Sequence, residues 1–483
     1  MPRSRIIPAL LLALAAVAGL DPSATRGAAA STKGFILTTD YTTGTLSVVD
    51  LDTRVVTPDV ASVSPDPVER WYQGLLYVVN RFGYDNVQVI DPAQGYATLR
   101  QFSVGSGTNA QDIAFVSPAK AYVSRLASPD LLIVNPASGA TLGVIPLAPW
   151  ADGDGNPEAA RMTMLGDLLF VALERLTNFL PADTGLVVVI DTRADTVYDA
   201  DPVTPGKQVV RLAGENPSTS FALLPGASQD PDRHLLVGCT GRWGILDGGI
   251  DDVHVPEGVP AQPGVIRSTG FMITEDALGG DAMDVVAYGS THSYAIVYDA
   301  GSNTSLVSWN PSTGAKLGTL YAPVGFSLSD AALNDRRELW VCNSSFDAPG
   351  LHVFRAGSDV RIAGPIATGL PPVQIVFDQN DDLAAAGDLP LPGRFSLAPA
   401  PNPASTFVRL ALRLPGPGAA RVEVFDLEGR RVRLLAAGDL PFSSVDLRWN
   451  LADESGRRVP AGLYLVRATA GQGTVTRRLV VIK

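Results

Sequence analysis

The stretch LLYVVNRFGYDNVQVIDPA, residues 75–93, holds two alternating apolar strands joined by a polar turn, and the second strand closes on Asp91. The same closing phrase returns along the chain, as LSVVD at 46–50, LLIVN at 131–135, LVVVID at 186–191 and LVSWN at 306–310. One such unit cannot bury its own apolar face. A return after about 40–50 residues therefore predicts an array of small β-sheets that stack on their neighbours.

Strands before and after this phrase complete a unit of four short antiparallel strands joined by Gly, Pro, Asn and Asp turns, which is typical of a β-propeller blade. Seven segments qualify as the second strand of a blade, near Ile36, Tyr77, Tyr122, Phe170, Leu236, Tyr294 and Trp340. The first blade lacks an innermost strand, whereas PPVQIVFD at 371–378 follows the seventh blade as an orphan. We therefore predict an all-β fold in which residues 31–378 form a seven-bladed β-propeller closed by strand 371–378, because closure removes the exposed sheet edges.

These residues also carry a resemblance. LYVVN followed by VQVIDPA resembles the YncE-like, YVTN-type β-propellers, and the repeat extends over roughly residues 35–378. The resemblance implies an extracytoplasmic or surface protein. Members and relatives of this superfamily include surface proteins, binding proteins and lactonase-type enzymes, so the family leaves the activity open.

The composition limits the partners and the redox chemistry. The 483 residues carry a net charge of −12 with no concentrated basic stripe, so we expect no nucleic-acid partner. Both cysteines, Cys239 and Cys342, end apolar strands at equivalent positions of different blades. We therefore predict two buried free thiols rather than a disulfide.

The N-terminus has the pattern of an export signal. MPRSR is a positive n-region, and the apolar run at 6–20 is too short to span a bilayer comfortably. We predict a signal peptide over residues 1–30, with cleavage after Ala18 or after Ala30 as alternatives, and no transmembrane segment after its removal. The expected location is extracellular or on the outer-membrane surface, with the periplasm as the alternative.

The C-terminal part reads as a second domain. A polar linker rich in Pro and Gly at 379–394 precedes six short alternating strands over residues 395–483, which predict a small immunoglobulin-like β-sandwich. The motifs APNPAS at 400–405, VFDLEGRRV at 424–432 and RRLVVIK at 477–483 resemble the C-terminal sorting domain of type IX secretion and the FlgD-like immunoglobulin-like module. The resemblance implies a role in export or surface attachment, with type IX-like machinery as a partner. The family commonly has Phe at the position that Ala404 occupies in this chain.

Candidate ligand residues gather on one predicted face of the ring. In a four-stranded blade, the connections between the second and third strands and from one blade to the next emerge on the same face, at the mouth of the central channel. The predicted site residues on that face are Arg81, Arg125, Arg161, Arg175, Arg242, Glu158 and Glu174. Convergent guanidiniums favour an anionic ligand such as a carboxylate, a sulfate or an acidic sugar. The alternative is that each arginine pairs with a local acid such as Asp130 or Asp183.

One loop has the spacing of a calcium site. ADGDGNPEAAR at 151–161 carries oxygen-bearing side chains at alternate positions, namely Asp152, Asp154, Asn156 and Glu158. Glycines between oxygen ligands let a backbone curl around Ca²⁺, so calcium is a candidate cofactor. The alternative is a plain acidic turn.

Catalytic motifs are absent from the sequence: it has no G-x-S-x-G and no H-E-x-x-H, and its four histidines lack metal-ligand spacing. We therefore predict no catalytic residues and favour a non-enzymatic binding module for a small anionic or carbohydrate-like ligand or a surface protein. The alternatives are a lactonase- or lyase-type enzyme with its site at the channel mouth, and a structural surface-layer or adhesion protein.

Overall fold

The structure is a computed structural model that describes residues 31–225, 232–260, 264–378, 396–400, 404–413, 418–426, 429–440, 444–470 and 473–482. The chain divides into two compact units, one of residues Ala30–Arg394 and one that contains Phe395–Lys483. The predicted signal peptide at 1–30 and the predicted linker at 379–394 lie outside the described residues. None of the helices among the described residues is long and apolar enough to cross a bilayer.

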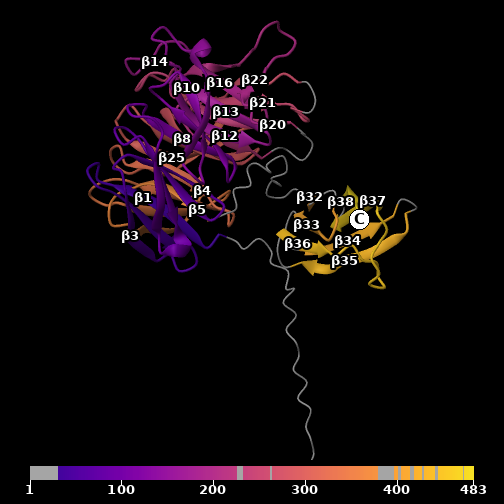
Figure 1. Ribbon diagram of the computed structural model, residues 1–483. Helices are drawn as coiled ribbons and strands as arrows, with labels where there is room; N and C mark the ends of the chain where they lie inside the picture. Colours follow the sequence, from indigo (N-terminus) through magenta and orange to yellow (C-terminus); the bar gives the residue numbers. More distant parts are fainter. Residues whose placement is uncertain are drawn as a thin grey trace, which may run out of the picture. The chain divides into compact units, whose positions relative to one another are not determined.

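Antiparallel sheets of four strands, or five in blade 4, follow one another in the first unit, and we number them as blades 1 to 7, each from its innermost strand outward (Figure 1). Blade 1 consists of β31 (Pro372–Phe377), β1 (Lys33–Thr39), β2 (Gly44–Asp50) and β3 (Val56–Val63). Blade 2 consists of β4 (Pro67–Tyr72), β5 (Leu75–Asn80), β6 (Asn86–Asp91) and β7 (Ala97–Ser103). Blade 3 consists of β8 (Ala110–Ser117), β9 (Lys120–Arg125), β10 (Asp130–Asn135) and β11 (Ala140–Pro146).

Blade 4 consists of β12 (Ala159–Leu165), β13 (Leu168–Leu173) and β16 (Thr184–Asp191), with β17 (Thr196–Val197) and β18 (Val210–Glu215) both paired to β16. Blade 5 consists of β19 (Ala222–Leu224), β20 (Arg233–Cys239), β21 (Gly249–Val255) and β22 (Arg267–Thr274). Blade 6 consists of β23 (Asp281–Gly289), β24 (His292–Tyr298), β25 (Thr304–Asn310) and β26 (Ala315–Tyr321). Blade 7 consists of β27 (Leu328–Leu333), β28 (Glu338–Asn343), β29 (Gly350–Arg355) and β30 (Val360–Ile366).

Short elements decorate the connections. A small hairpin of β14 (Leu176–Thr177) and β15 (Leu180–Pro181) lies between the second and third strands of blade 4. One helical turn, α1 (Glu275–Leu278), joins blades 5 and 6, and the 3-10 turns are η1 (Pro92–Gln94) and η2 (Ala148–Trp150).

Burial explains the continuous apolar runs of the sequence. The second strand of blade 2, β5, is buried over Leu76–Asn80, because neighbouring blades cover both of its faces, whereas the outermost strand β7 is mostly exposed. The innermost strands contact each other around the axis, β31 with β4, β4 with β8, β8 with β12, β19 with β23, β23 with β27 and β27 with β31. The prediction of an all-β propeller fold is therefore confirmed.

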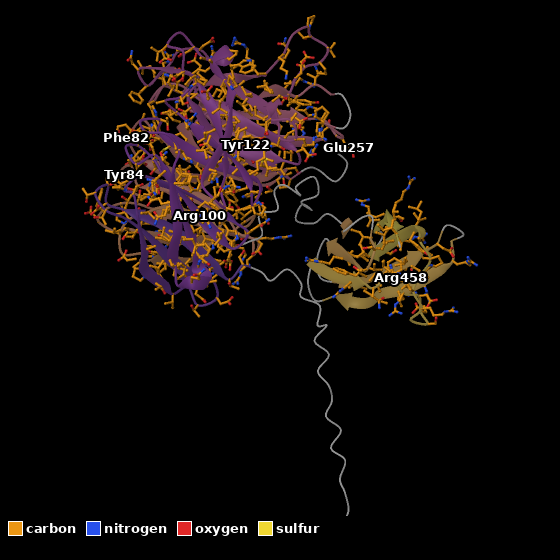
Figure 2. The ribbon with its side chains drawn as sticks, in the orientation of Figure 1. Phe82, Tyr84, Arg100, Tyr122, Glu257 and Arg458 are labelled. Atoms are coloured by element: carbon orange, nitrogen blue, oxygen red, sulfur yellow. The ribbon has the colours of Figure 1, made fainter. Side chains whose placement is uncertain are left out.

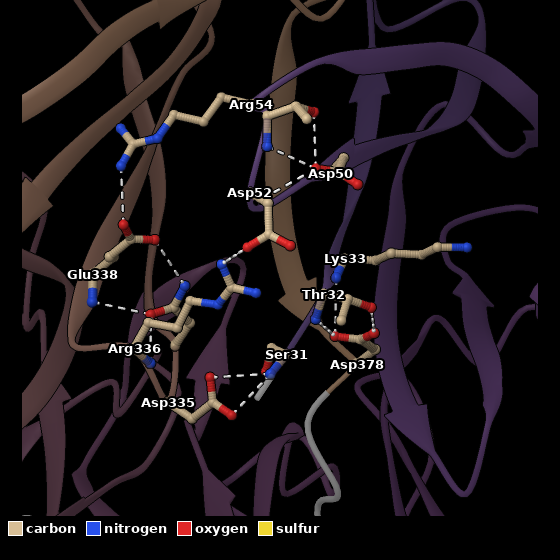
Figure 3. Close-up of polar contacts among 12 residues, drawn as sticks. Ser31, Thr32, Lys33, Asp50, Asp52, Arg54, Asp335, Arg336, Glu338 and Asp378 are labelled. Carbon is tan, nitrogen blue, oxygen red and sulfur yellow. Dashed lines mark hydrogen bonds and ion pairs between the residues drawn. The ribbon is translucent and has the colours of Figure 1, made fainter. Parts of the chain in front are cut away.

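The ring is joined where the two ends of the unit meet. β31 pairs antiparallel with β1, with Phe35 opposite Val376 and Ile36 opposite Ile375. Figure 3 shows the polar contacts at this seam: the Asp378 carboxylate accepts hydrogen bonds from the Thr32 and Lys33 N–H groups at 2.7 and 3.0 Å.

Ion pairs between blades 1 and 7 reinforce the seam. Arg54 contacts Glu338 at 2.9 Å, and Arg336 contacts Asp52 at 2.6 Å (Figure 3). Blade 1 is thus built from segments at both ends of the unit and tied to its neighbour by charge.

Both cysteines lie inside the first unit. Cys239 ends β20 and Cys342 lies in β28, and each is buried and not part of a disulfide, as predicted. Burial raises the pKa of both thiols well above their ordinary value, so they pack as small apolar groups.

The second unit is a two-layer β-sandwich. One sheet has the order β32 (Ser396–Ala400), β33 (Val408–Arg413) and β36 (Ser444–Trp449), and the other has the order β35 (Arg431–Leu440), β34 (Gly418–Phe425), β37 (Gly462–Ala470) and β38 (Gly473–Val481). Trp449 and Tyr464 pack edge to face in its core, at a centroid distance of 5.6 Å. Ala404 is fully buried in this core, and its N–H donates to the Val480 carbonyl at 2.8 Å.

Candidate functional site

One face of the propeller carries the predicted site residues. It is formed by the connections between second and third strands and by those that lead from one blade to the next, and we call it the loop face. Figure 2 labels Phe82 and Tyr84 from this face at one edge of the propeller, and Glu257, which follows the third strand of blade 5, at the opposite edge. Two of the cavities that open on the loop face are lined by predicted site residues, and we name them the channel mouth and the loop pocket.

The channel mouth is a polar cavity of about 220 Å³ between the first residues of the innermost strands. Arg161 from β12, Asp284 from β23, Asp330 from β27 and Gln374 from β31 line it, together with Arg81 from the loop after β5. Deeper in the channel a second cavity of about 210 Å³ has apolar walls that include Trp71 and Met164. The channel is therefore polar at the loop face and apolar further in.

β-bulges aim the polar side chains of the mouth. The strand register shifts immediately before Asp112, Asp284 and Asp330, each near the start of an innermost strand. A bulge re-aims the side chains beside it, which is why such irregularities recur at functional sites. In β12 the shift lies between Ala159 and Met162, so Arg161 is part of the irregular segment.

The same carboxylates hold neighbouring blades together. The Oδ2 atom of each accepts a hydrogen bond from a backbone N–H of the next innermost strand, at 3.0 Å in all three cases: Asp112 from Met162, Asp284 from Ala331 and Asp330 from Ile375. Gln374 continues the pattern, since its Oε1 accepts from the Glu69 N–H at 2.8 Å. Asp284, Asp330 and Gln374, which line the channel mouth, thus also hold neighbouring blades together, and Asp112, which does not line it, makes the same contact between blades 3 and 4.

Burial and charge perturb these acids. Burial raises the pKa of Asp284 and of Asp330, the Asp284 carboxylate raises the pKa of Asp330 further, and Arg161 counteracts the rise in both. Glu69 is fully buried, and burial followed by the nearby Asp330 raises its pKa well above the ordinary value. The mouth therefore gathers more acid than its cations neutralise.

Arg161 is the cation at the centre of this arrangement. Its Nη1 atom is buried and has no hydrogen-bond partner among the described residues. Burial lowers the pKa of the guanidinium, which Asp112 and Glu174 oppose. For Glu174, burial raises the pKa to about 7, and Arg161 and Arg81 counteract that rise. A buried donor without a protein partner is what a ligand-binding cavity leaves free.

Of the other predicted arginines, Arg81 lines this mouth and Arg125, Arg175 and Arg242 do not. Arg81 lines it, but its guanidinium is paired with Asp66 and donates to Gln111 Oε1 at 3.1 Å. Arg125 is buried and donates to the backbone carbonyls of Val104 and Asp130, both at 3.2 Å. These two arginines fix loops by local contacts.

The remaining two arginines also pair locally. Arg175 contacts Asp183 at 2.9 Å and donates to the Thr184 carbonyl at 2.9 Å, so it anchors the loop that carries the β14–β15 hairpin. Arg242 is exposed and contacts Asp247 at 2.7 Å. Of the predicted arginines, the structure brings Arg81 and Arg161 together at the mouth and keeps the others apart.

The loop pocket is larger, at about 450 Å³, and lies among the loop-face connections of blades 2, 3 and 4. Phe82 and Phe179 line it, although their side chains are 75% and 81% exposed. Glu158 is buried in it, and its Oε2 accepts a hydrogen bond from the Leu176 N–H at 2.9 Å. Burial raises the pKa of Glu158 to about 8, which the Leu176 N–H opposes.

The predicted calcium loop contributes side chains to this pocket. Asp152 Oδ1 and Asp154 Oδ1 accept hydrogen bonds within their own loop, from the N–H groups of Asp154 and Asn156 at 3.2 and 2.8 Å. Asp154, Asn156 and Glu158 line the loop pocket. Throughout the described ranges, no group of three or more His, Cys, Asp or Glu side chains is placed to hold a metal ion.

The sequence analysis missed the acids of the innermost strands. The signal was present in the innermost strands, where QDIAF at 111–115, MDVVA at 283–287 and SDAAL at 329–333 each place one Asp at the same position of the repeat. An ionisable side chain in an otherwise apolar strand, repeated in phase, marks a shared structural or functional position.

No protein-family model and no curated protein matches this chain. Among solved structures, it is similar to a putative 6-phosphogluconolactonase from Bacteroides uniformis, with 12% identity, a TM-score of 0.50, and 72% of this chain and 100% of that chain covered. A functionally unknown protein from Desulfotomaculum acetoxidans matches with 14% identity, a TM-score of 0.46, and 73% and 100% covered. PorZ, a surface component of the type-IX secretion system of Porphyromonas gingivalis, matches with 13% identity, a TM-score of 0.23, and 94% and 75% covered. The first of these similarities agrees with the propeller fold seen in the sheets, and it shows the fold alone.

Proposed function

We propose that this chain is an exported, non-enzymatic binding protein of the YncE-like type, whose channel mouth takes a small sugar acid. The observation that carries the proposal is the buried Nη1 of Arg161, which has no partner among the described residues and belongs to a side chain that lines an open polar cavity. A carboxylate is the natural partner of a buried guanidinium. The ligand therefore presents one negative group.

The rest of the ligand is set by the other walls. Asp284, Asp330, Ser329 and Gln374 line the same cavity, and they offer acceptors and a hydroxyl to alcohol groups. A wholly anionic ligand such as sulfate would meet the two aspartates unfavourably. A polyhydroxylated carboxylate fits both halves of the mouth, because its carboxylate faces Arg161 and its hydroxyls face the acids.

Calorimetric titration with glucuronate and gluconate tests this proposal. We expect binding that Arg161→Met weakens at least about tenfold, because a hydrogen bond to a charged group contributes about 1.5–3 kcal/mol. Arg242→Ala is the matched control, since Arg242 lies on the loop face but does not line the mouth. Equal binding by wild type and Arg161→Met, or no binding of either acid, contradicts the proposal.

A second candidate function rests on the raised pKa values of Asp284 and Asp330 beside Arg161. A carboxyl group poised near neutral pH moves protons, and a guanidinium polarises a carbonyl, which together suit a lactonase- or lyase-type reaction. Hydrolysis of a sugar lactone, followed as proton release, separates the two functions. Turnover that Asp330→Asn abolishes favours the enzyme over the binding protein.

We further propose that the residues 395–483 serve type IX-like export or surface attachment, as their motifs imply. The buried Ala404, where the family commonly has Phe, forms backbone hydrogen bonds with Val480 and Ile482 and so still joins the segment before β33 to the last strand. Mass spectrometry of the secreted protein tests this role. An intact, freely soluble full-length product argues against it.

A further inference from the structure

The loop pocket is a second cavity, separate in its lining from the channel mouth. At about 450 Å³ it lies within the roughly 300–1,000 Å³ typical of small-molecule sites. Five successive loop-face connections build it, from the loop after β5 to the loop after β13. The proposed binding of a sugar acid at the channel mouth does not use it.

Contacts within the loops fix its shape. Asp85 is buried, and its two carboxylate oxygens accept the N–H groups of Asn109 and Gly107 at 2.8 and 2.7 Å, which ties the loop of blade 2 to the connection towards blade 3. Thr177 Oγ1 donates to Asp152 Oδ2 at 3.0 Å, which ties the β14–β15 hairpin to the connection before β12. The walls of the pocket are therefore held in place by hydrogen bonds.

The hairpin presents an aromatic ring in a strained backbone. Phe179, near the tip of the β14–β15 hairpin, has φ of +63°, and Glu158 across the pocket has φ of +47°. Side chains other than Gly, Asn and Asp rarely adopt this left-handed region, and such residues cluster at binding sites. Phe82 supplies a second exposed ring to the same cavity.

The polar lining excludes an anion and offers neutral hydrogen-bonding groups. No Arg, Lys or His lines this cavity among the described residues, whereas Asp85, Asp154 and Glu158 do. The amide side chains of Asn156 and Asn178 also line it and make no hydrogen bond with the described residues. An amide both donates and accepts, so this pair suits alcohol groups.

From this juxtaposition we propose that the loop pocket binds a neutral sugar unit, which lies against the rings of Phe82 and Phe179 and exchanges hydrogen bonds with Asn156, Asn178 and Glu158. The apolar C–H face of a sugar ring covers the exposed aromatic surface, and its hydroxyls reach the amides and the acid. The protein thus has two sites of different chemistry on one face, one for a sugar acid and one for a neutral sugar.

Protonated Glu158 has a defined part in this site. Burial raises its pKa to about 8, so at neutral pH the carboxyl carries a proton and donates a hydrogen bond to a sugar oxygen. Above about pH 8 the group becomes an acceptor with a negative charge. The carboxylates of Asp154, Asp152 and Glu174 add to the rise in this pKa. Sugar binding therefore changes as the pH rises through this range, and Glu158→Gln, which cannot ionise, removes that dependence.

Calorimetric titration with maltotriose, cellotriose and mannotriose tests the proposal, with glucuronate and choline as charged probes. We expect one or more trisaccharides to bind and Phe179→Ala to weaken that binding by about tenfold, the size typical of an aromatic anchor. Phe346→Ala is the matched control, because Phe346 is an exposed ring of the loop face outside this pocket. Its affinity should equal that of the wild type.

Three results would overturn the sugar site: no trisaccharide binds at millimolar concentration, choline alone binds, or Phe346→Ala weakens binding as much as Phe179→Ala. Arg161→Met separates the two proposals. This substitution leaves trisaccharide binding unchanged if the loop pocket is the site, whatever its effect on glucuronate.

Discussion

The channel mouth and the loop pocket open on the same face of one propeller, yet they are made of different parts of the chain. The mouth is walled by innermost strands, whose acids also hydrogen-bond to the next blade. The pocket is walled by loops, whose exposed phenylalanines make no such tie. In this fold, chemistry in the channel is coupled to stability, whereas chemistry in the loops is free to change.

Asp112→Ala should show most strongly how much the acids of the innermost strands contribute to stability. Asp112 is fully buried, its Oδ2 contacts Arg70 at 2.8 Å and accepts the Met162 N–H, and its loss leaves charged and polar groups without their partner. We expect a loss of about 3 kcal/mol in the free energy of unfolding, measured with urea. Asp154→Ala in the loop pocket is the control, and an equal loss there would break the comparison.

Asp330→Asn should change the pH dependence of stability at the mouth. Burial and Asp284 raise the pKa of Asp330, so its protonated form stabilises the fold at low pH and this stabilisation is lost as the pH rises through the raised value. Asn keeps an oxygen for the Ile375 N–H and cannot ionise. We expect the variant to gain on the order of 2 kcal/mol over wild type between pH 5 and pH 8. Parallel pH profiles would contradict the coupling.

Glu158→Gln should also reduce the pH dependence of the free energy of unfolding, but by a smaller amount, because the loop pocket is open to solvent. The folded pKa of Glu158 is raised from 4.5 to about 8, so its stabilising proton is fully bound below about pH 4.5 and is lost as the pH rises through about 8. Unfolding measured across this range should give a flatter profile for the variant, with a gain of about 1 kcal/mol at pH 8. A gain in stability as large as that of Asp330→Asn would contradict the expected difference between the channel mouth and the loop pocket.

Phe179→Ala should have the smallest effect on stability. Its ring is largely exposed, so we expect the free energy of unfolding to change by less than about 0.5 kcal/mol. The melting temperature checks this, with Phe346→Ala beside it. A marked loss would mean that the ring supports the hairpin rather than a ligand.

The sequence predicts the scaffold better than the sites because the scaffold repeats. Apolar runs around Tyr77 and Tyr122 predict the second strands, because neighbouring blades cover both faces of each strand. An arginine at the end of a second strand is predicted to lie on the loop face. Its ion-pair partner is not predicted, because the loops that supply the partner differ from blade to blade. Arg81 meets Asp66 and Arg242 meets Asp247 for that reason.

The candidate acids were hidden for a different reason. Asp284 and Asp330 stand in otherwise apolar strand patterns, and a bulge beside each, which the strand period does not predict, aims them at the mouth. The alternate spacing of Asp152 and Asp154 predicts a cation loop, and in the structure one oxygen of each carboxylate accepts a backbone N–H of its own turn. The spacing of acidic residues in the sequence predicts which side-chain oxygens lie near each other, but it does not predict the orientation of those side chains.

The pairing of β31 with β1 joins two strands that are synthesised at very different times. A ribosome or an export channel delivers Gly34 long before Phe377, so blade 1 cannot acquire its innermost strand until nearly the whole unit has been delivered. The propeller is completed in one late event, and whatever keeps the inner edge of β1 from pairing with another chain has to act until Asp378 has emerged.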